Sequence, residues 1–420
     1  MQALQDKLVA PISQRTSLLF FIMTFSAVVP LYFESVRVLA GLVFLGILVT
    51  LSFKSYQTKS YQISKMEKAW IYVAVIYAGF FIFNYFLHTP YSKDGEWRNA
   101  APIFILWFSY WYFLSIRLNL QKQLINYVAL SSIAVAVILF AVELIIADSL
   151  VGYRFGLVSD GSRGLAATGF ILPITTVLLT VLWLQNRSWL YFVLLLTGLL
   201  LSGLNGSRTA FIMVMIPILA GLAFLLIWNR TFSKKIKVWA ILVIMPLLLM
   251  TAFLAKDKIK DTFTDFSAIE KGQYMSSMGL RMAMWDTGII ALEDHWLLGV
   301  GPSDYKMHIV SVVNKMDYSP EVKGFISGVM QIHNQYLMTS ILSGVVGLMS
   351  LFFFLGYPVW VFMQSFKEGN EIASVVSIGL IIGIVFVMFF GAIFTYTYTT
   401  IFYMLATSSL VSFFAKSREQ

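Results

Sequence analysis

The chain alternates between long apolar stretches and short polar ones, and this pattern predicts a bundle of membrane-spanning helices. A helix needs about 20 mostly apolar residues to cross the hydrocarbon core of a bilayer. We expect about twelve spans, with one long, tilted or kinked helix over 332–363 and two spans in 371–414, broken near Gly391. The predicted spans cover 17–33, 36–53, 69–87, 100–117, 124–147, 166–184, 189–204, 209–228, 238–255, 332–363 and 371–414. The expected fold is therefore an all-α, polytopic membrane protein.

One long segment, about 256–331, has the polar character of a soluble region. It divides the chain into residues 1–255 with spans 1–9, a mainly helical outer loop over 256–331, and residues 332–420 with spans 10–12. Together these parts are expected to form one integral membrane domain. Within the loop, Ser276-Ser277 predicts a helix cap before residues 278–292, because serine side chains accept hydrogen bonds from free helical N–H groups.

Three further patterns complete the prediction for this loop. Gly299-Val300-Gly301-Pro302 is expected to break the chain, since glycine and proline both interrupt regular helices. Residues 256–261 alternate acidic and basic side chains and predict a polar helix. Residues 316–328 are expected to be an irregular loop.

Composition excludes several classes of protein. Hydrophobic residues make up 59% of the 420 residues and charged residues only 12%, about half the share of an ordinary soluble domain. A soluble enzyme could not bury so much apolar surface, and a disordered chain would not contain it. The absence of cysteine excludes a disulfide scaffold, a thiolate metal site and a cysteine nucleophile.

The distribution of basic residues predicts the orientation. With the N-terminus in the cytoplasm, 16 of the 30 lysines and arginines fall in cytoplasmic segments, 6 in short outer loops and 8 in the long outer loop. This excess indicates that both termini are cytoplasmic. It also accounts for the net charge of +9 without nucleic acid as a partner. Lys7 and Arg15 precede the first apolar run, which lacks a clear cleavage site and is expected to be a retained span.

Two arginines stand just before predicted spans on the outer face. Arg208 follows Ser207, a plausible helix N-cap, and Arg163 follows Asp160-Gly161-Ser162. A helix N-terminus beside a guanidinium group favours a phosphate. The alternative is that each arginine extends to the lipid headgroups.

A third arginine, Arg281, lies in the predicted loop helix among methionines and Trp285. It either pairs with Asp286 or stacks on Trp285, or it points towards an anionic lipid head in a membrane-facing cleft.

His333 and Asn334 stand at the mouth of the span that begins near 332. Histidine exchanges a proton near neutral pH, so His333 is a candidate general base. Asn334 could fix the tautomer of that histidine or bind a sugar hydroxyl. The alternative is a purely structural histidine.

The acidic residues give little indication of a metal site. Asp257, Asp261 and Asp265 share one helix face, but lysines interleave them, which is typical of a solvated surface. Glu34 and Glu143 lie within or beside spans, where a proton relay and a structural role are both open. We therefore expect arginines rather than a metal ion to neutralise any bound phosphate.

Taken in order, several segments resemble the O-antigen ligase family, within the wider O-antigen ligase/polymerase superfamily. The matching segments are Ser207-Arg208-Thr209-Ala210, then Gly279 to Trp285 followed by His295 to Pro302, then His333 to Leu337 followed by Gly344 to Leu348, and more weakly Arg163 with Gly169 before Leu172-Pro173. The local similarity covers about 160–350, while the expected topology matches along essentially the whole chain. Many superfamily members carry an acidic residue where this chain has Ser343, so no role is given to a carboxylate there.

The resemblance implies an inverting glycosyl transfer at the periplasmic face of a bacterial inner membrane, in lipopolysaccharide biosynthesis. The implied donor is O-antigen on undecaprenyl pyrophosphate, and the implied acceptor is a sugar hydroxyl of lipid A-core. Neither a metal nor a nucleotide cofactor is implied. By position, His333 would be the catalytic base, and Arg208, Arg281 and Arg163 would bind the pyrophosphate, with Ser207 and Asn334 in support.

Other functions remain open at this point. A polymerase of O-antigen or exopolysaccharide would use the same donor, and a ligase that glycosylates proteins is a further variant. A transporter of lipid-linked glycans would instead show charged residues in mid-span and repeated halves. We see no such repeat, and the arginines gather at one face.

Overall fold

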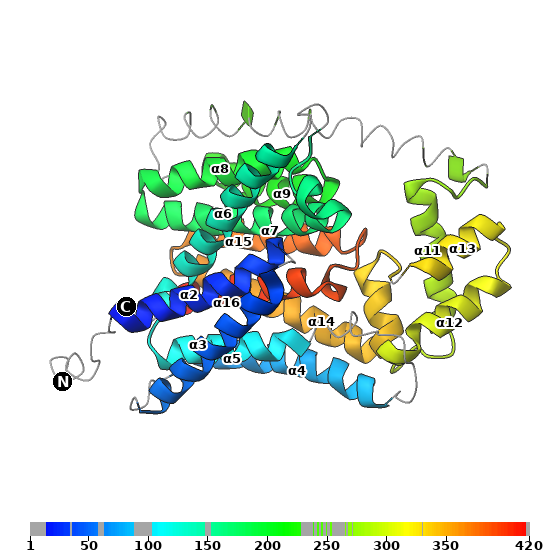
Figure 1. Ribbon diagram of the computed structural model, residues 1–420, viewed down its shortest axis with the longest axis horizontal. Coiled ribbons are helices and arrows are strands. Elements are labelled where there is room, and N and C mark those ends of the chain that lie inside the picture. Colours follow the sequence, from blue (N-terminus) through cyan, green and yellow to red (C-terminus); the bar gives the residue numbers. More distant parts are fainter. Residues whose placement is uncertain are drawn as a thin grey trace.

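Helices make up every regular element in the part of the chain that the structure describes (Figure 1). The structure is a computed structural model, and it describes residues 14–33, 36–57, 63–87, 103–147, 153–227, 272–329 and 331–416, with short pieces between 238 and 270. The helices are α2 (Gln14–Tyr32), α3 (Arg37–Gln57), α4 (Lys65–Leu87), α5 (Ile103–Arg117), α6 (Gln121–Ile146), α7 (Leu157–Asn186), α8 (Trp189–Asn205), α9 (Arg208–Ile227), α11 (Ser277–Leu292), α12 (Gly301–Lys315), α13 (Pro320–Gly328), α14 (Gln335–Lys367), α15 (Glu371–Val387), the 3-10 turn η3 (Ile393–Thr395) and α16 (Thr397–Lys416).

The predicted polytopic helical fold is confirmed. Eight described helices are long and apolar enough to cross a membrane, and α8 and α15 are shorter apolar helices. Eleven of the predicted spans coincide with α2 to α9 and α14 to α16. The remaining one, 238–255, lies mostly outside the described residues, so the total of twelve stays a prediction.

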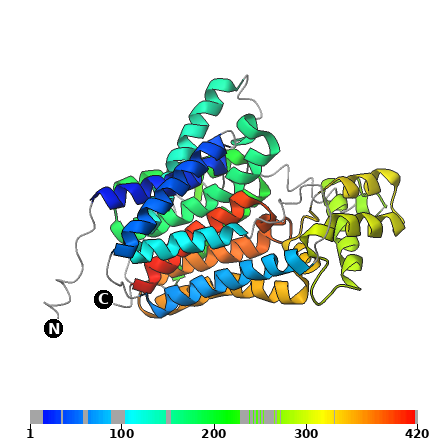
Figure 2. The same cartoon turned by 60° about the horizontal axis from the view of Figure 1, so that its bottom comes forward.

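The C-terminal helix α16 forms the centre of the bundle. Its span is 94% buried, and it contacts α2, α4, α5, α6, α7 and α14. Helices α9 and α15 pack closely along one side. Helices α11, α12 and α13 project beyond one end of the bundle in both views (Figures 1 and 2). We call this the loop end.

The long helix α14 contains the predicted kink, and the structure locates it at Gly344. Gly344 has φ 64° and ψ −166°, a conformation that is essentially restricted to glycine. The connection between α11 and α12 fits against this break. Val345 N donates to Trp296 O (2.8 Å), and Val300 N donates to Ile341 O (2.7 Å). The glycine-rich pattern after Trp296 thus serves backbone docking.

The loop region differs from prediction in one respect. Residues 316–328 are not an irregular loop throughout, because Pro320–Gly328 is helix α13. Ser319 accepts a hydrogen bond from Val322 N (3.4 Å), and Pro320 occupies the first turn, where its missing N–H costs nothing. The helix predicted over 278–292 is confirmed as α11, with Ser276 as its N-cap. The polar helix predicted over 256–261 lies outside the described residues.

Candidate active site

His333 lies at the loop end, immediately before helix α14. Its backbone is left-handed (φ 48°), a conformation that is uncommon for a residue with a side chain. The next residue, Asn334, is the N-cap of α14, and its Oδ1 accepts a hydrogen bond from Leu337 N (3.1 Å). Asn334 therefore fixes where the helix begins, and this placement leaves His333 half-buried at its mouth.

Two glutamines bind the segment around His333 to the connection between α15 and α16. Gln335 N donates to Met388 O (2.8 Å), and Gln335 Oε1 accepts from Phe394 N (2.7 Å). Gln331 hydrogen-bonds to the Tyr396 hydroxyl group. These contacts hold the unusual backbone at 333 in place.

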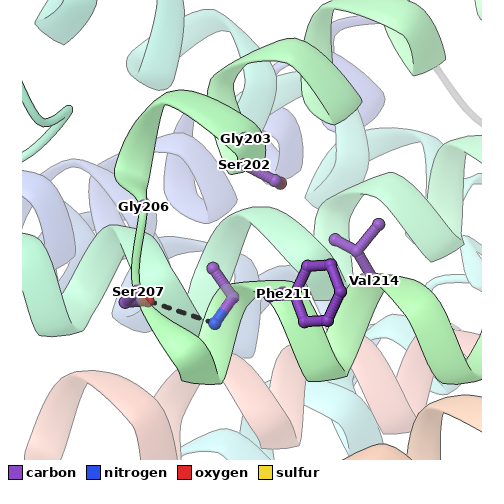
Figure 3. A pocket seen from close by; sticks show the side chains of 7 residues that line it. Ser202, Gly203, Gly206, Ser207, Phe211 and Val214 are labelled. Atoms are coloured by element: carbon purple, nitrogen blue, oxygen red, sulfur yellow. Dashed lines mark hydrogen bonds between the residues drawn. The ribbon is translucent and has the colours of Figure 1, made fainter. Parts of the chain in front are cut away.

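Arg208 is the first residue of α9, directly after the turn from α8. Ser207 caps the helix as predicted, since its Oγ accepts from Ala210 N (3.1 Å; Figure 3). Arg208 is half-buried, and no residue within the described part of the chain hydrogen-bonds to its guanidinium group. A pocket of about 10 Å³, room for one water molecule, adjoins this turn. It is lined by Ser202, Gly203, Gly206, Ser207, Ala210, Phe211 and Val214.

Asn205 anchors the turn that carries Arg208. This fully buried amide donates from Nδ2 to Phe155 O (3.1 Å) and Leu165 O (2.9 Å), and its Oδ1 accepts from Ser207 N (3.2 Å). Arg154 Nε donates to Asn205 O (3.1 Å). Neither Asn205 nor Arg154 is predicted from the sequence to belong to the site. Only the Asn-Gly pair at 205–206 gave a sequence signal, and that signal indicates a turn.

Arg281 projects from the first turns of α11. Its Nη1 donates to Ser277 O (3.1 Å) and Ser277 Oγ (2.8 Å). The Nε atom is buried, as is Trp285 Nε1 one turn later, and no described residue accepts a hydrogen bond from either. Asp286, the alternative partner predicted for Arg281, accepts from the Tyr318 hydroxyl group instead (2.9 Å). Two donors on adjacent turns of α11 are thus left without acceptors, a condition that proteins generally avoid.

Three of the predicted residues interact electrostatically. Burial, and then the positive charge of Arg208, lower the pKa of Arg281 from its ordinary value, while Asp265 opposes the shift. Burial, and then the positive charge of Arg281, lower the pKa of His333 to about 4. Because Coulomb interactions weaken with distance and screening, the coupling links α9, α11 and the mouth of α14 in one region. His333 is therefore a neutral imidazole at pH 7.

Arg163 contacts the same end of the bundle by a different route. Helix α7 begins at Leu157, so Arg163 lies inside its second turn and not in a preceding loop as the sequence suggested. Its guanidinium carbon lies 5.8 Å from the centroid of the Tyr398 ring, and Tyr398 stacks on Tyr396 at 5.2 Å. Arg163 is thus linked through aromatic rings to the segment around His333.

The acidic residues have structural partners. Asp265 Oδ2 accepts from Met278 N at the start of α11 (3.2 Å), which differs from the predicted solvated surface. Glu143 is buried, and its Oε2 accepts from the Tyr153 hydroxyl group (2.8 Å) and Gly156 N (2.9 Å). Asp257, Asp261 and Glu34 lie outside the described residues. The described residues include no group of three or more His, Asp or Glu side chains that could hold a metal ion.

The arrangement offers a neutral imidazole beside guanidinium groups, at the ends of several helices. Such groups can accept a proton and stabilise a polyanion in the same site. The helix start at Ser207 adds N–H groups whose partial charge also favours an anion.

Comparison with known proteins agrees with this picture. Residues 190–352 match a family model described as O-antigen ligase, a range that includes Arg208, Arg281 and His333. An uncharacterized protein of Haemophilus influenzae is 25% identical over 204 residues, which cover 47% of this chain and 49% of that protein. The chain thus spans about half the length of the curated relative it matches.

Proposed function

We propose that this chain is a glycosyltransferase that ligates O-antigen, on the premise that its residues 190–352 match a family model described as O-antigen ligase. The donor is O-antigen polysaccharide on undecaprenyl pyrophosphate. The acceptor is a sugar hydroxyl of lipid A-core. The loop end faces the periplasm of a bacterial inner membrane, and both termini lie in the cytoplasm. The observation that supports the proposal best is the electrostatic coupling of Arg208, Arg281 and His333 at one end of the bundle.

His333 is the proposed general base. The acceptor hydroxyl attacks the anomeric carbon of the donor sugar, while the imidazole accepts the hydroxyl proton. A C–O bond forms to the acceptor, the C–O bond to pyrophosphate breaks, and attack from the opposite face inverts the anomeric centre. Base catalysis by a placed side chain contributes roughly 10²- to 10⁴-fold to a rate. The low pKa of His333 keeps the imidazole unprotonated at pH 7, and a bound pyrophosphate that offsets the charge of Arg281 would raise the proton affinity of the imidazole.

The arginines are the proposed pyrophosphate site. The leaving pyrophosphate gains negative charge as its bond to the sugar breaks, so guanidinium groups fixed beforehand stabilise the transition state more than the ground state. Arg208 and Arg281 contribute most directly, and Arg163 extends the site from α7. The unpartnered Nε of Arg281 and Nε1 of Trp285 supply two further donors. Ser207 and Asn334 hold the helix starts that position Arg208 and His333.

Product analysis tests the proposal. Purified protein and the variant His333→Ala are incubated with undecaprenyl-pyrophosphate O-antigen and lipid A-core, with chelator present, and the products are separated on a gel. We expect core capped with O-antigen from the wild type and none from the variant. His295→Ala is the matched control, because His295 is exposed at the loop end and lies outside the proposed site.

The other outcomes contradict the proposal in different ways. A longer lipid-linked glycan with uncapped core would identify a polymerase that uses the same donor. Capping by both proteins would remove the base role of His333 and keep the ligase. No product from folded protein in any reaction would contradict the transferase and support transport of the glycan.

A further inference from the structure

Three consecutive apolar side chains are exposed in the connection between α11 and α12. Trp296 is 61% exposed, Leu297 48% and Leu298 36%. In water, large adjacent apolar side chains of this kind are unfavourable, and such a patch marks a binding or membrane surface. The exposed run therefore needs a partner that is itself apolar.

The backbone contacts of these residues place them beside the first third of a long candidate span. Trp296 O accepts a hydrogen bond from Val345 N, about ten residues after the start of the candidate span Gln335–Lys367. At 1.5 Å per residue, this contact lies roughly 15 Å along the helix from Gln335. Gln335 itself hydrogen-bonds to Met388 at the end of α15, so the start of α14 is level with the ends of its neighbours.

The contacts of helix α4 give a second, independent indication of how deep the connection lies. Asn84 Nδ2 donates to Leu298 O (3.0 Å) and to Leu342 O (3.2 Å). Asn84 is the last residue of the candidate span Lys65–Asn84. Leu298 therefore lies at a depth that an apolar span of α4 also reaches.

Several polar backbone groups of this connection have partners within the protein. Trp296 O and Leu298 O accept the bonds already described, and Gly299 N donates to His295 O (2.8 Å). In the broken part of α14, Ile341 O accepts from Val300 N. Irregular backbone is tolerated at membrane depth only when protein groups satisfy it in this way.

The two helices that contact this connection, α4 and α14, also expose large apolar side chains. Phe83 on α4 is 53% exposed and Phe353 on α14 is 69% exposed, and both lie in or beside candidate spans. Exposed Glu293, Asp294 and His295 immediately precede Trp296. The change from charged to apolar side chains at this point is typical of a boundary between headgroups and hydrocarbon.

From these observations we propose that residues 296–298 form a re-entrant segment that enters the outer leaflet and contacts lipid acyl chains. The α11–α12 connection is then a part of the membrane-embedded surface and not a purely aqueous loop. This inference does not depend on glycosyl transfer. Its consequence is that the α11–α12 connection lies at the level of the lipid acyl chains.

Spin labelling tests the proposal directly, because the chain contains no cysteine and needs no background removal. Single variants Trp296→Cys and Leu297→Cys are labelled with a nitroxide and reconstituted into phospholipid vesicles. Accessibility is measured to oxygen, which concentrates in hydrocarbon, and to a water-soluble nickel complex. Phe353→Cys is the lipid-facing control, and Glu321→Cys on α13 is the aqueous control.

We expect labels at 296 and 297 to favour oxygen over nickel, as at 353, and the label at 321 to show the opposite preference. A preference for nickel at 296 and 297 would place the segment in water and overturn the proposal. Shielding from both reagents would indicate a protein neighbour and would also overturn it.

A second measurement keeps the test decisive where a cysteine variant does not fold. The tryptophan fluorescence of the wild type and of Trp296→Phe is compared in vesicles with brominated acyl chains. We expect the wild type to lose an additional component of fluorescence that the variant lacks. Equal fractional quenching of the two proteins would contradict lipid contact at Trp296.

Discussion

At position 333, geometry and electrostatics favour the same chemistry. The left-handed backbone is held by the cap at Asn334 and by the glutamines on either side. Burial and Arg281 together keep the imidazole neutral at physiological pH. A strained, partly buried histidine beside an arginine is the kind of residue that functional sites contain.

The pH dependence of activity follows from the lowered pKa of His333. The proposed base acts when it is neutral, so activity falls as the pH drops through its pKa. We expect the acid limb of kcat/KM, which reports the free enzyme, to lie near pH 4 and well below the ordinary 6.5. Bound pyrophosphate offsets the charge of Arg281, so the acid limb of kcat is expected at higher pH than that of kcat/KM.

A pH–rate profile of the purified enzyme, fitted separately for kcat and kcat/KM, checks this order. The exposed-histidine variant His295→Ala should give the same profile as the wild type. An acid limb of kcat/KM at pH 6.5 or above would contradict the assignment to His333.

The two central arginines differ from lysine in geometry as well as charge. A guanidinium group binds two phosphate oxygens at once, whereas an ammonium group acts as a point charge. We expect Arg208→Lys and Arg281→Lys each to lower kcat/KM by about tenfold or more, a loss of roughly 1.4 kcal/mol in transition-state binding. Initial rates with the lipid-linked donor measure the effect. Arg187→Lys is the control, because Arg187 lies at the other end of α7. Normal rates in both site variants would contradict the proposed role of Arg208 and Arg281 in binding pyrophosphate.

At the scale of elements, the break in α14 depends on glycine. A Cβ atom at Gly344 would lie 2.0 Å from Leu297 O, and one at Gly299 would lie 2.5 Å from Ile341 O. The two segments approach backbone to backbone, so neither glycine can be replaced without moving the other segment. Asn84 hydrogen-bonds to both segments, at Leu298 O and at Leu342 O.

Alanine substitution at Gly344 is therefore expected to lower the stability severely. The substitution forces a side chain into a glycine-only conformation and against backbone atoms, at a cost of more than about 3 kcal/mol. Gly356→Ala is the matched control in the same helix, since a Cβ there meets nothing within 4 Å. We expect the control to change stability by less than about 1 kcal/mol, and in the favourable direction.

Thermal unfolding of the two variants in detergent, followed by tryptophan fluorescence, compares them directly. A Gly344→Ala protein that unfolds at the temperature of the control would contradict the close approach of the two segments.

At the scale of the whole molecule, the helices bring together residues that are far apart in sequence. Arg208 is the first residue of α9, Arg281 lies on α11 at the loop end, and His333 precedes α14. The central helix α16 contacts helices from α2 to α14. Its Tyr398 ring lies against the guanidinium group of Arg163 on α7. The candidate site therefore combines residues from several helices and does not belong to any single helix.

The proposed orientation predicts which end of the bundle is accessible from outside the cell. Gln273 is exposed at the loop end, and Gln185 is exposed at the end of α7. In a cell with a permeabilised outer membrane, we expect Gln273→Cys to react with a membrane-impermeant maleimide. Gln185→Cys should react only after the inner membrane is disrupted. The reverse pattern would invert the proposed topology.

From the sequence alone, the class of fold and the positions of most helices could be predicted, and Arg208, Arg281 and His333 could be proposed as site residues. The length of an apolar segment predicts a membrane span because the hydrocarbon core of a bilayer has a nearly constant thickness. The helix caps at Ser207 and Ser276 can be predicted because their hydrogen bonds are local. Helix α13 was not predicted from the sequence. Its capping signal at Ser319-Pro320 lies in a polar loop, where helix propensity alone is weak.

The contacts that hold the candidate site together are evident only in the tertiary structure. The roles of Asn84 and Asn205 depend on backbone carbonyls from distant segments, and local sequence patterns carry no record of such contacts. The low pKa of His333 has the same origin, since it arises from burial and from an arginine on another helix. Short-range patterns specify elements because their hydrogen bonds are local, whereas burial and charge coupling are specified only when those elements pack.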